Sequence, residues 1–167
     1  MRLSPAILVL AVSAAALGAC NKQQASAPSS AAPEQAAAPA GEPTPEQAKA
    51  ILATLPATYQ TADLDNGKHK FAQCAACHTL TQGGPNMTGP NLYGVFGRKV
   101  GTAAGYDYSD AIKAQGFTWD ADHINTWITD PRAMAPGTKM TFMGLKDPKD
   151  RTDVIAYVKV QTTPPKG

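Results

Sequence analysis

The chain has 167 residues, a formal net charge of +2 and only 7% aromatic residues. So small a charge creates no field that would attract nucleic acid, and we expect no nucleic-acid partner. The length corresponds to one domain with additional segments. A small domain with few large aliphatic side chains usually needs disulfides, a metal or a large cofactor to complete its core.

Residues 1–20 have the pattern of an export signal. Arg2 is the only charge before a nearly wholly apolar run from Pro5 to Ala19, which is too short and too rich in alanine for a comfortable membrane span. Its end, Leu-Gly-Ala-Cys at residues 17–20, resembles the bacterial lipoprotein cleavage motif. We therefore expect Cys20 to carry lipid; the alternative is ordinary cleavage nearby, which leaves Cys20 as a free thiol.

Residues 21–43 consist mostly of Ala, Pro, Ser, Gln and Glu. Because such a segment cannot bury enough apolar surface to offset its ordering entropy, we expect a disordered tether. Residues 44–58 predict a short amphipathic helix, with Thr44 as N-cap, Pro45 in the first position and Gln47 closing a capping box. The sequence leaves open whether this helix packs on the domain formed by residues 59–167.

The domain is expected to be all-α, since the sequence shows no strand periodicity. Asp65 is expected to cap a helix that runs into the cysteines, and Gly67 and Phe71 share a face of it. A short helix is expected around residues 109–114, and residues 133–145 read as a loop.

Two further helices are expected near the C-terminus. Asp120 or Thr118 caps a helix that ends before Pro131. The final helix opens with Asp147 as cap and Pro148 in the first position, where the ring fits without loss of a hydrogen bond.

The spacing of two cysteines indicates which group the domain binds. The five residues from Cys74 through Cys77 to His78 form C-x-x-C-H, the attachment signature of haem c. Cysteines three apart on a helical turn can reach the two vinyl groups at one edge of a porphyrin, and the next residue then presents its imidazole to the iron. The alternatives are a zinc half-site and a redox-active dithiol. Zinc requires further ligands, but only His69 and His123 remain, without ligand spacing.

A second axial ligand has to come from the residues downstream of His78. Candidates are His123, Lys139 and the methionines. Met140 follows Pro136 and Gly137 in a loop segment, and a loop methionine by itself is more often a core filler.

Several stretches of the sequence resemble class I cytochrome c of the mitochondrial and bacterial electron-shuttle type, and they occur in the same order as in that family. They span Gly67 to Val160, nearly the whole folded part, and they are residues 67–79, 88–92, 94–99, 105–111, 118–119, 136–140 and 151–157. The resemblance implies three main helices, with short helices and loops, around one haem bound covalently through Cys74 and Cys77.

The resemblance also implies the ligands of the iron. His78 and Met140 would be its axial ligands, and this pair raises the potential above that of a bis-histidine haem. The carbonyl of Pro90 would accept a hydrogen bond from His78, and Thr138 would brace the loop of Met140.

Two further groups of residues have implied roles. Arg98, Tyr108 and Trp119 would hold the haem propionates. Gly67 and Phe71 would meet the last helix where the first and last helices cross, at Val154 and Tyr157.

Three positions depart from the family pattern. Trp127 stands where the family usually has a tyrosine whose hydroxyl touches the methionine sulfur. Ile112 replaces a polar residue and is expected to make the pocket drier. Ala133 removes a lysine that can replace methionine at alkaline pH, which leaves Lys139 as the nearest candidate.

A saturated iron predicts an electron carrier and not an enzyme, without a small-molecule substrate. The resemblance implies a respiratory role between quinol–cytochrome c oxidoreductase and a terminal oxidase, and the expected lipid places the domain at the periplasmic side of the bacterial inner membrane. Weak steering of an acidic partner is expected from basic side chains near the haem edge: Lys70, Lys99, Lys113, Arg132, Lys139 and Lys146. The alternatives are a peroxidase-like haem enzyme or sensor with a labile distal ligand, and a carrier for a dedicated periplasmic dehydrogenase or nitrogen-oxide reductase.

Overall fold

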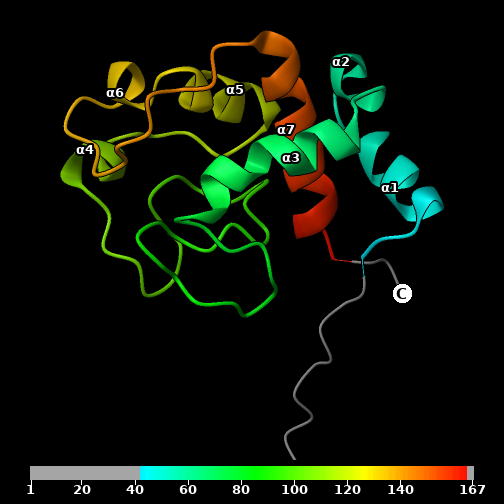
Figure 1. Ribbon diagram of the computed structural model, residues 1–167. Coiled ribbons are helices and arrows are strands. Elements are labelled where there is room, and N and C mark those ends of the chain that lie inside the picture. Colours follow the sequence, from blue (N-terminus) through cyan, green and yellow to red (C-terminus); the bar gives the residue numbers. More distant parts are fainter. Residues whose placement is uncertain (1–41, 165–167) are drawn as a thin grey trace, which may run out of the picture. The chain divides into compact units, whose positions relative to one another are not determined.

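A computed structural model describes residues 42–164 (Figure 1). The predicted signal sequence with Cys20, and the predicted tether except for its last two residues, lie outside the described residues. Apart from an isolated antiparallel bridge between Lys99 and Thr118, the regular structure from 42 to 164 is helical. The helices are α1 (Pro45–Leu52), α2 (Ala57–Gln60), α3 (Leu64–Ala75), α4 (Asp110–Lys113), α5 (Ala121–Thr129), α6 (Pro131–Met134) and α7 (Pro148–Thr162).

The expected helix starts are confirmed at three places. Thr44 caps α1, and Gln47 completes the capping box by accepting from the Thr44 backbone N–H at 2.8 Å. Asp120 accepts from the backbone N–H of His123 at 2.8 Å and so caps α5. Asp147 caps α7, where two backbone N–H groups donate to its carboxylate.

The cap of α3 is Asp63, and the expectation of Asp65 is wrong. Asp63 has an extended backbone and its carboxylate accepts from the Asn66 N–H at 2.9 Å. Asp65 lies two residues further on, in the first turn of α3, where its negative charge interacts favourably with the positive end of the helix.

The segment expected to be a loop from residue 133 begins inside α6. Asp130 accepts from the Ala133 N–H at 3.1 Å, and Pro131 occupies the first position of this one-turn helix. Pro131 therefore ends α5, as expected, and also starts the next helix.

Helices α3 and α7 cross in direct contact (Figure 1). A Cβ on Gly67 would lie 2.3 Å from the Asp153 carbonyl oxygen and 2.8 Å from the Tyr157 Cβ, so only glycine permits this approach. Phe71 packs against Tyr157 with ring centroids 5.7 Å apart. The expected crossing is confirmed.

Helix α7 is buried on more than one side. Val154 and Val158 line a cavity. Ile155 and Ala156, which lie on other faces of the helix, are 0% exposed, and Val160 is 2% exposed. These faces are covered because α7 contacts α1, α2, α3 and α5. The apolar positions of α7 are therefore covered by other helices on several sides, while its first turn carries charged residues.

The packing of α1, which the sequence left open, is resolved. Leu52 and Leu55 are each 7% exposed and join the core cluster that contains the α7 side chains. Tyr59 on α2 is buried in the same cluster. None of the helices between residues 42 and 164 combines the length and the hydropathy that crossing a membrane requires.

Candidate cofactor site

A mainly apolar cavity of about 320 Å³ lies beside α3 and α7. Its size is at the lower end of the roughly 300–1,000 Å³ typical of ligand pockets. Segments far apart in the sequence line it, and the expected site residues among them are Cys74, Cys77, His78, Pro90, Arg98, Tyr108, Trp119, Thr138 and Met140. The structure therefore brings the nine sequence-predicted site residues to one cavity.

The C-terminal end of α3 supplies the attachment motif. Cys74 lies in the last turn, and its carbonyl accepts from the N–H groups of both Cys77 and His78 at 3.0 Å. This continued turn places both sulfur atoms and the imidazole on the cavity wall. Burial, with a smaller contribution from Cys77, raises the pKa of the Cys74 thiol to about 11. A redox-active dithiol needs a lowered pKa, so this environment does not suit that alternative.

The imidazole of His78 is held in one orientation. Its Nδ1 lies 2.7 Å from the Pro90 carbonyl oxygen. Because a carbonyl only accepts, Nδ1 carries the proton in this hydrogen bond and Nε2 keeps a free lone pair. Burial lowers the pKa of His78, against the opposing effect of the Pro90 hydrogen bond, and so favours the neutral ring that binds metals.

Gly89 lets the loop approach this ring. A Cβ at position 89 would lie 2.3 Å from His78 Cε1 and 2.7 Å from both ring nitrogens. The Gly89 N–H donates to the Cys77 carbonyl at 2.9 Å, which fixes the loop against the motif.

Met140 reaches the cavity from a separate loop. The Met140 N–H donates to Thr138 Oγ1 at 3.2 Å, and the Thr138 N–H donates to the Ala135 carbonyl at 3.0 Å. The neighbouring Lys139 ties this loop to the segment before α4, since its Nζ lies 2.5 Å from an Asp107 carboxylate oxygen.

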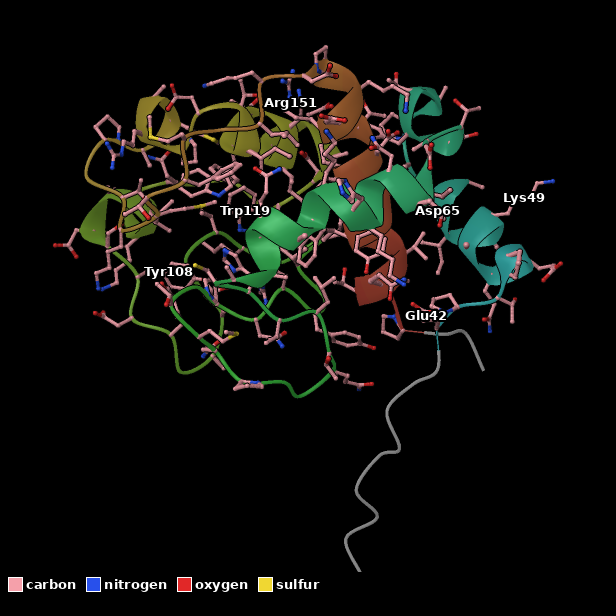
Figure 2. The ribbon with its side chains drawn as sticks, viewed as in Figure 1. Glu42, Lys49, Asp65, Tyr108, Trp119 and Arg151 are labelled. Atoms are coloured by element: carbon pink, nitrogen blue, oxygen red, sulfur yellow. The ribbon has the colours of Figure 1, made fainter. Side chains whose placement is uncertain are left out.

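Polar side chains also line the cavity. Arg98 donates to the Asn91 carbonyl at 3.0 Å and forms no ion pair with a carboxylate among the described residues. Its burial lowers the pKa of the guanidinium, and burial raises the pKa of Tyr108. Tyr108 and Trp119 lie on the side of α7 away from Lys49 on α1 (Figure 2).

Sequence reasoning missed Ser109. Its Oγ lines the cavity and is the one buried side-chain oxygen or nitrogen of the described residues without a hydrogen-bond partner. The only sequence signal was its position next to Tyr108 in a matching stretch.

Two of the three departures from the family pattern, Ile112 and Trp127, line the cavity, whereas Ala133 lies in α6 outside the lining. Ile112 lines the cavity and is 5% exposed, so it presents an apolar wall. Trp127 also lines the cavity and packs edge-on against Trp119 at 5.9 Å. Within residues 42–164 its indole N–H donates to no acceptor, the sulfur of Met140 included.

These features fit a covalently bound haem. Two thiols and a metal-binding imidazole lie on one cavity wall, and a thioether reaches the same cavity from another segment. Arg98 and the free hydroxyl of Ser109 offer a positive charge and a donor to acidic groups. In the described part of the chain no cluster of three or more His, Cys, Asp or Glu side chains is arranged to hold a metal ion, which the zinc alternative requires.

Most of the basic side chains expected near the haem edge form ion pairs or hydrogen bonds within the domain. Three form ion pairs and one donates to a carbonyl: Lys70 to Asp150 at 2.8 Å, Lys139 to Asp107 at 2.5 Å, Lys113 to Asp107 at 3.7 Å, and Lys146 to the Thr129 oxygen at 2.9 Å. Among the described residues, Lys99 and Arg132 have no such side-chain contact. The cations therefore give less local positive charge than their number suggests.

Comparison with known proteins gives consistent matches. The family model described as cytochrome c matches residues 64–162. Cytochrome c2 of Rhodoplanes tepidamans is 50% identical over 96 residues, which cover 58% of this chain and 90% of the relative. Cytochrome c of Cochliobolus lunatus is 45% identical over 105 residues, or 62% of this chain and 97% of the relative. The solved structure of cytochrome cH from Methylobacterium extorquens superimposes with a TM-score of 0.55 at 46% identity, covering 59% of this chain and 98% of that one.

The helical fold around one cavity, with the attachment motif on its wall, defines a c-type cytochrome, an electron carrier with haem bound covalently through Cys74 and Cys77. The chain belongs to the cytochrome c family, because the family match covers more than half of its length. Its all-α fold of the class I type is the one that the sequence predicted.

Proposed function

We propose that this protein carries single electrons in a respiratory chain, with His78 and Met140 as the axial ligands of its haem iron. The observation that carries the proposal is that these side chains line the same cavity from two separate segments. A thioether opposite an imidazole favours the ferrous state, so we expect a positive midpoint potential. When bound, the haem supplies a one-electron change of its iron.

The chain holds and insulates this group. The Pro90 carbonyl orients His78 through Nδ1, and Thr138 positions Met140 through its backbone N–H. Arg98, Tyr108, Trp119 and Ser109, which line the cavity, would hold the propionates, whose charges burial would otherwise make unfavourable. Ile112 and the other apolar lining residues exclude water, which limits reorganisation when the charge changes.

With His78 and Met140 both bound, the iron would have no open position for a substrate, and for this reason we propose a carrier and not an enzyme. The donor would be quinol–cytochrome c oxidoreductase and the acceptor a terminal oxidase. Lipid on Cys20 would hold the domain at the periplasmic side of the bacterial inner membrane, where residues 21–43 act as a tether. A tether raises the effective concentration of the domain near membrane partners.

Methionine ligation is tested by Met140→Ala, with Met143→Ala as a matched control. Met143 is 74% exposed in the same loop, so its loss leaves the cavity unchanged. We expect wild type and Met143→Ala to show the methionine-to-iron absorption in the oxidised state, and Met140→Ala to lose it and bind carbon monoxide rapidly. A wild-type spectrum without this absorption, or a midpoint potential far below zero, would contradict the proposal.

A second candidate is a haem enzyme or sensor with a labile distal ligand. It is favoured by one observation: the Trp127 indole N–H donates to no acceptor within the described residues, so it does not support the Met140 sulfur. Fast carbon monoxide binding by the wild-type protein would support this candidate. A deletion strain tested for oxidase-linked respiration separates the respiratory carrier from one that serves a dedicated dehydrogenase or reductase.

A further inference from the structure

Residues 42–63 form a strap that the family segment lacks. The family match begins at Leu64, whereas the described residues begin at 42 and include α1 and α2. An isolated helix needs about 12–15 residues to be even marginally stable in water. Since α1 has 8 residues, packing and its cap must hold it in place.

The strap is attached along its whole length. Ala48, Leu52, Leu55 and Tyr59 are 6–7% exposed and lie in the main core cluster. At its end the backbone N–H of Asp63 donates to the buried carboxylate of Asp153 at 3.0 Å.

Glu42 and Tyr59 of the strap also make polar contacts with other helices. Glu42 at its start pairs with Lys68 of α3 at 3.0 Å, although both side chains are exposed and the pair is weak. The hydroxyl of Tyr59 makes a long hydrogen bond of 3.5 Å to the Ala121 carbonyl at the start of α5. The strap therefore contacts α3, α5 and α7.

No residue of the strap lines the cavity. Figure 2 shows Glu42 and Lys49 on the opposite side of α7 from Tyr108 and Trp119, which do line it. The chain therefore enters the domain on the side of the α3–α7 crossing that faces away from the cavity.

We infer that the strap fixes the point at which the N-terminal segment leaves the haem domain, on the side of the α3–α7 crossing away from the cavity, and so shortens the length of chain that can reach the cavity rim where redox partners must dock. A free segment of 22 residues would have an end-to-end distance of roughly 25 Å, about twice the radius of gyration of a domain of this size. Docking removes this freedom. The fixed exit point does not depend on the proposed lipid attachment. Only the benefit of a fixed exit point to a membrane-anchored carrier rests on that attachment.

The exit point is measured in the haem-loaded protein, exported with an ordinary cleavable signal in place of residues 1–19, with Cys20→Ser and a nitroxide on Ala50→Cys, an exposed position of α1. Electron paramagnetic resonance gives the distances between this label and the ferric iron. We expect one narrow distribution. Leu52→Asp, which places a charge in the buried interface, should broaden it to a spread of roughly 20 Å. The neighbouring exposed change Ala53→Asp adds the same charge and should leave the distribution narrow.

The effect on docking is measured as electron exchange with a soluble cytochrome c, used as a protein-sized probe. Leu52→Asp should slow the exchange by about twofold or more, and Ala53→Asp should match wild type. A broad distribution in the wild type, or equal exchange rates in all three proteins, would overturn the inference. If Leu52→Asp yields no haem protein, Leu52→Ser replaces it.

The lipid attachment is tested separately, by sedimentation of the native chain with phosphatidylcholine vesicles. A chain that stays in solution while the distance distribution is narrow would refute the anchor and leave the fixed exit point standing.

Discussion

Gly89 and His78 show how one missing side chain shapes the site. The imidazole packs directly on the Gly89 backbone, where a Cβ would overlap the ring at 2.3 Å. We therefore expect Gly89→Ala to displace His78, break its hydrogen bond to Pro90 and destabilise the protein by about 1–3 kcal/mol. The visible spectrum of the haem protein and its thermal unfolding report the two effects.

The control for this change is Gly116→Ala. An added Cβ at position 116 meets nothing within 4 Å, so its spectrum and melting temperature should stay close to those of the wild type. If Gly89→Ala behaved like this control, the close approach would not constrain His78.

At the scale of single residues, the sequence predicted the site residues that belong to a recognisable motif or to a stretch that resembles the family. Cys74, Cys77 and His78 followed from their spacing, and Met140 from the resemblance; all of them line the cavity. Ser109 was missed because a free hydroxyl is a property of packing, which leaves its oxygen buried without a partner. The direction of the Trp127 indole likewise depends on its contact with Trp119, and the sequence does not contain that information.

Between elements, the α3–α7 crossing depends on Gly67. Alanine there would improve helix propensity by about 1 kcal/mol. Its Cβ would nevertheless overlap backbone atoms of Asp153 on α7, which cannot rotate away as a side chain can. We expect Gly67→Ala to lower the free energy of unfolding by about 1–3 kcal/mol in denaturant titrations, since overpacking dominates. An unchanged or higher stability would show that α3 and α7 can separate without loss.

Local signals predicted where most helices begin, and non-local packing decided the rest. Thr44, Asp120 and Asp147 cap helices because their side chains bond backbone groups a few residues away. The choice between Asp63 and Asp65 is different, because Asp63 also donates its backbone N–H to Asp153, 90 positions along the chain. The docking of α1 on α7 is likewise set by contacts that no local pattern encodes.

Over the whole molecule, charge pairing limits electrostatic steering. Asp107 binds Lys139 and lies near Lys113, and the Lys139 hydrogen bond lowers the pKa of this carboxyl. We expect the association rate with an acidic redox protein to change by less than about tenfold between low salt and about 0.15 M. Asp107→Asn should steepen this dependence, because it frees both lysines.

Asp122→Asn is the matched control for this experiment. It makes the same charge change at an exposed position of α5, outside the cavity lining. Equal salt dependence in the two variants would mean that only net charge matters, and that the pairing around Asp107 does not shape docking.

Acid stability should depend on Asp153, a 1% exposed carboxylate at the α3–α7 crossing. Burial raises its pKa, but hydrogen bonds from Lys149, Asn66 and the Asp63 N–H outweigh burial and hold the pKa below its usual value. A carboxyl with a lowered folded pKa stabilises the fold above its unfolded pKa of about 3.9, and this stabilisation is lost as pH falls through the folded pKa.

Asp153→Asn should therefore act in two ways. At pH 7 it should lower the free energy of unfolding by about 1–3 kcal/mol, because buried donors lose their charged acceptor. Below pH 4 the difference from the wild type should shrink, since the wild type then loses the same interaction by protonation. Denaturant titrations from pH 7 to pH 3 measure both effects, with Asp65→Asn as an exposed control on α3. A difference that stayed constant over this range would show that the loss comes from packing, and that the charge of Asp153 does not stabilise the crossing.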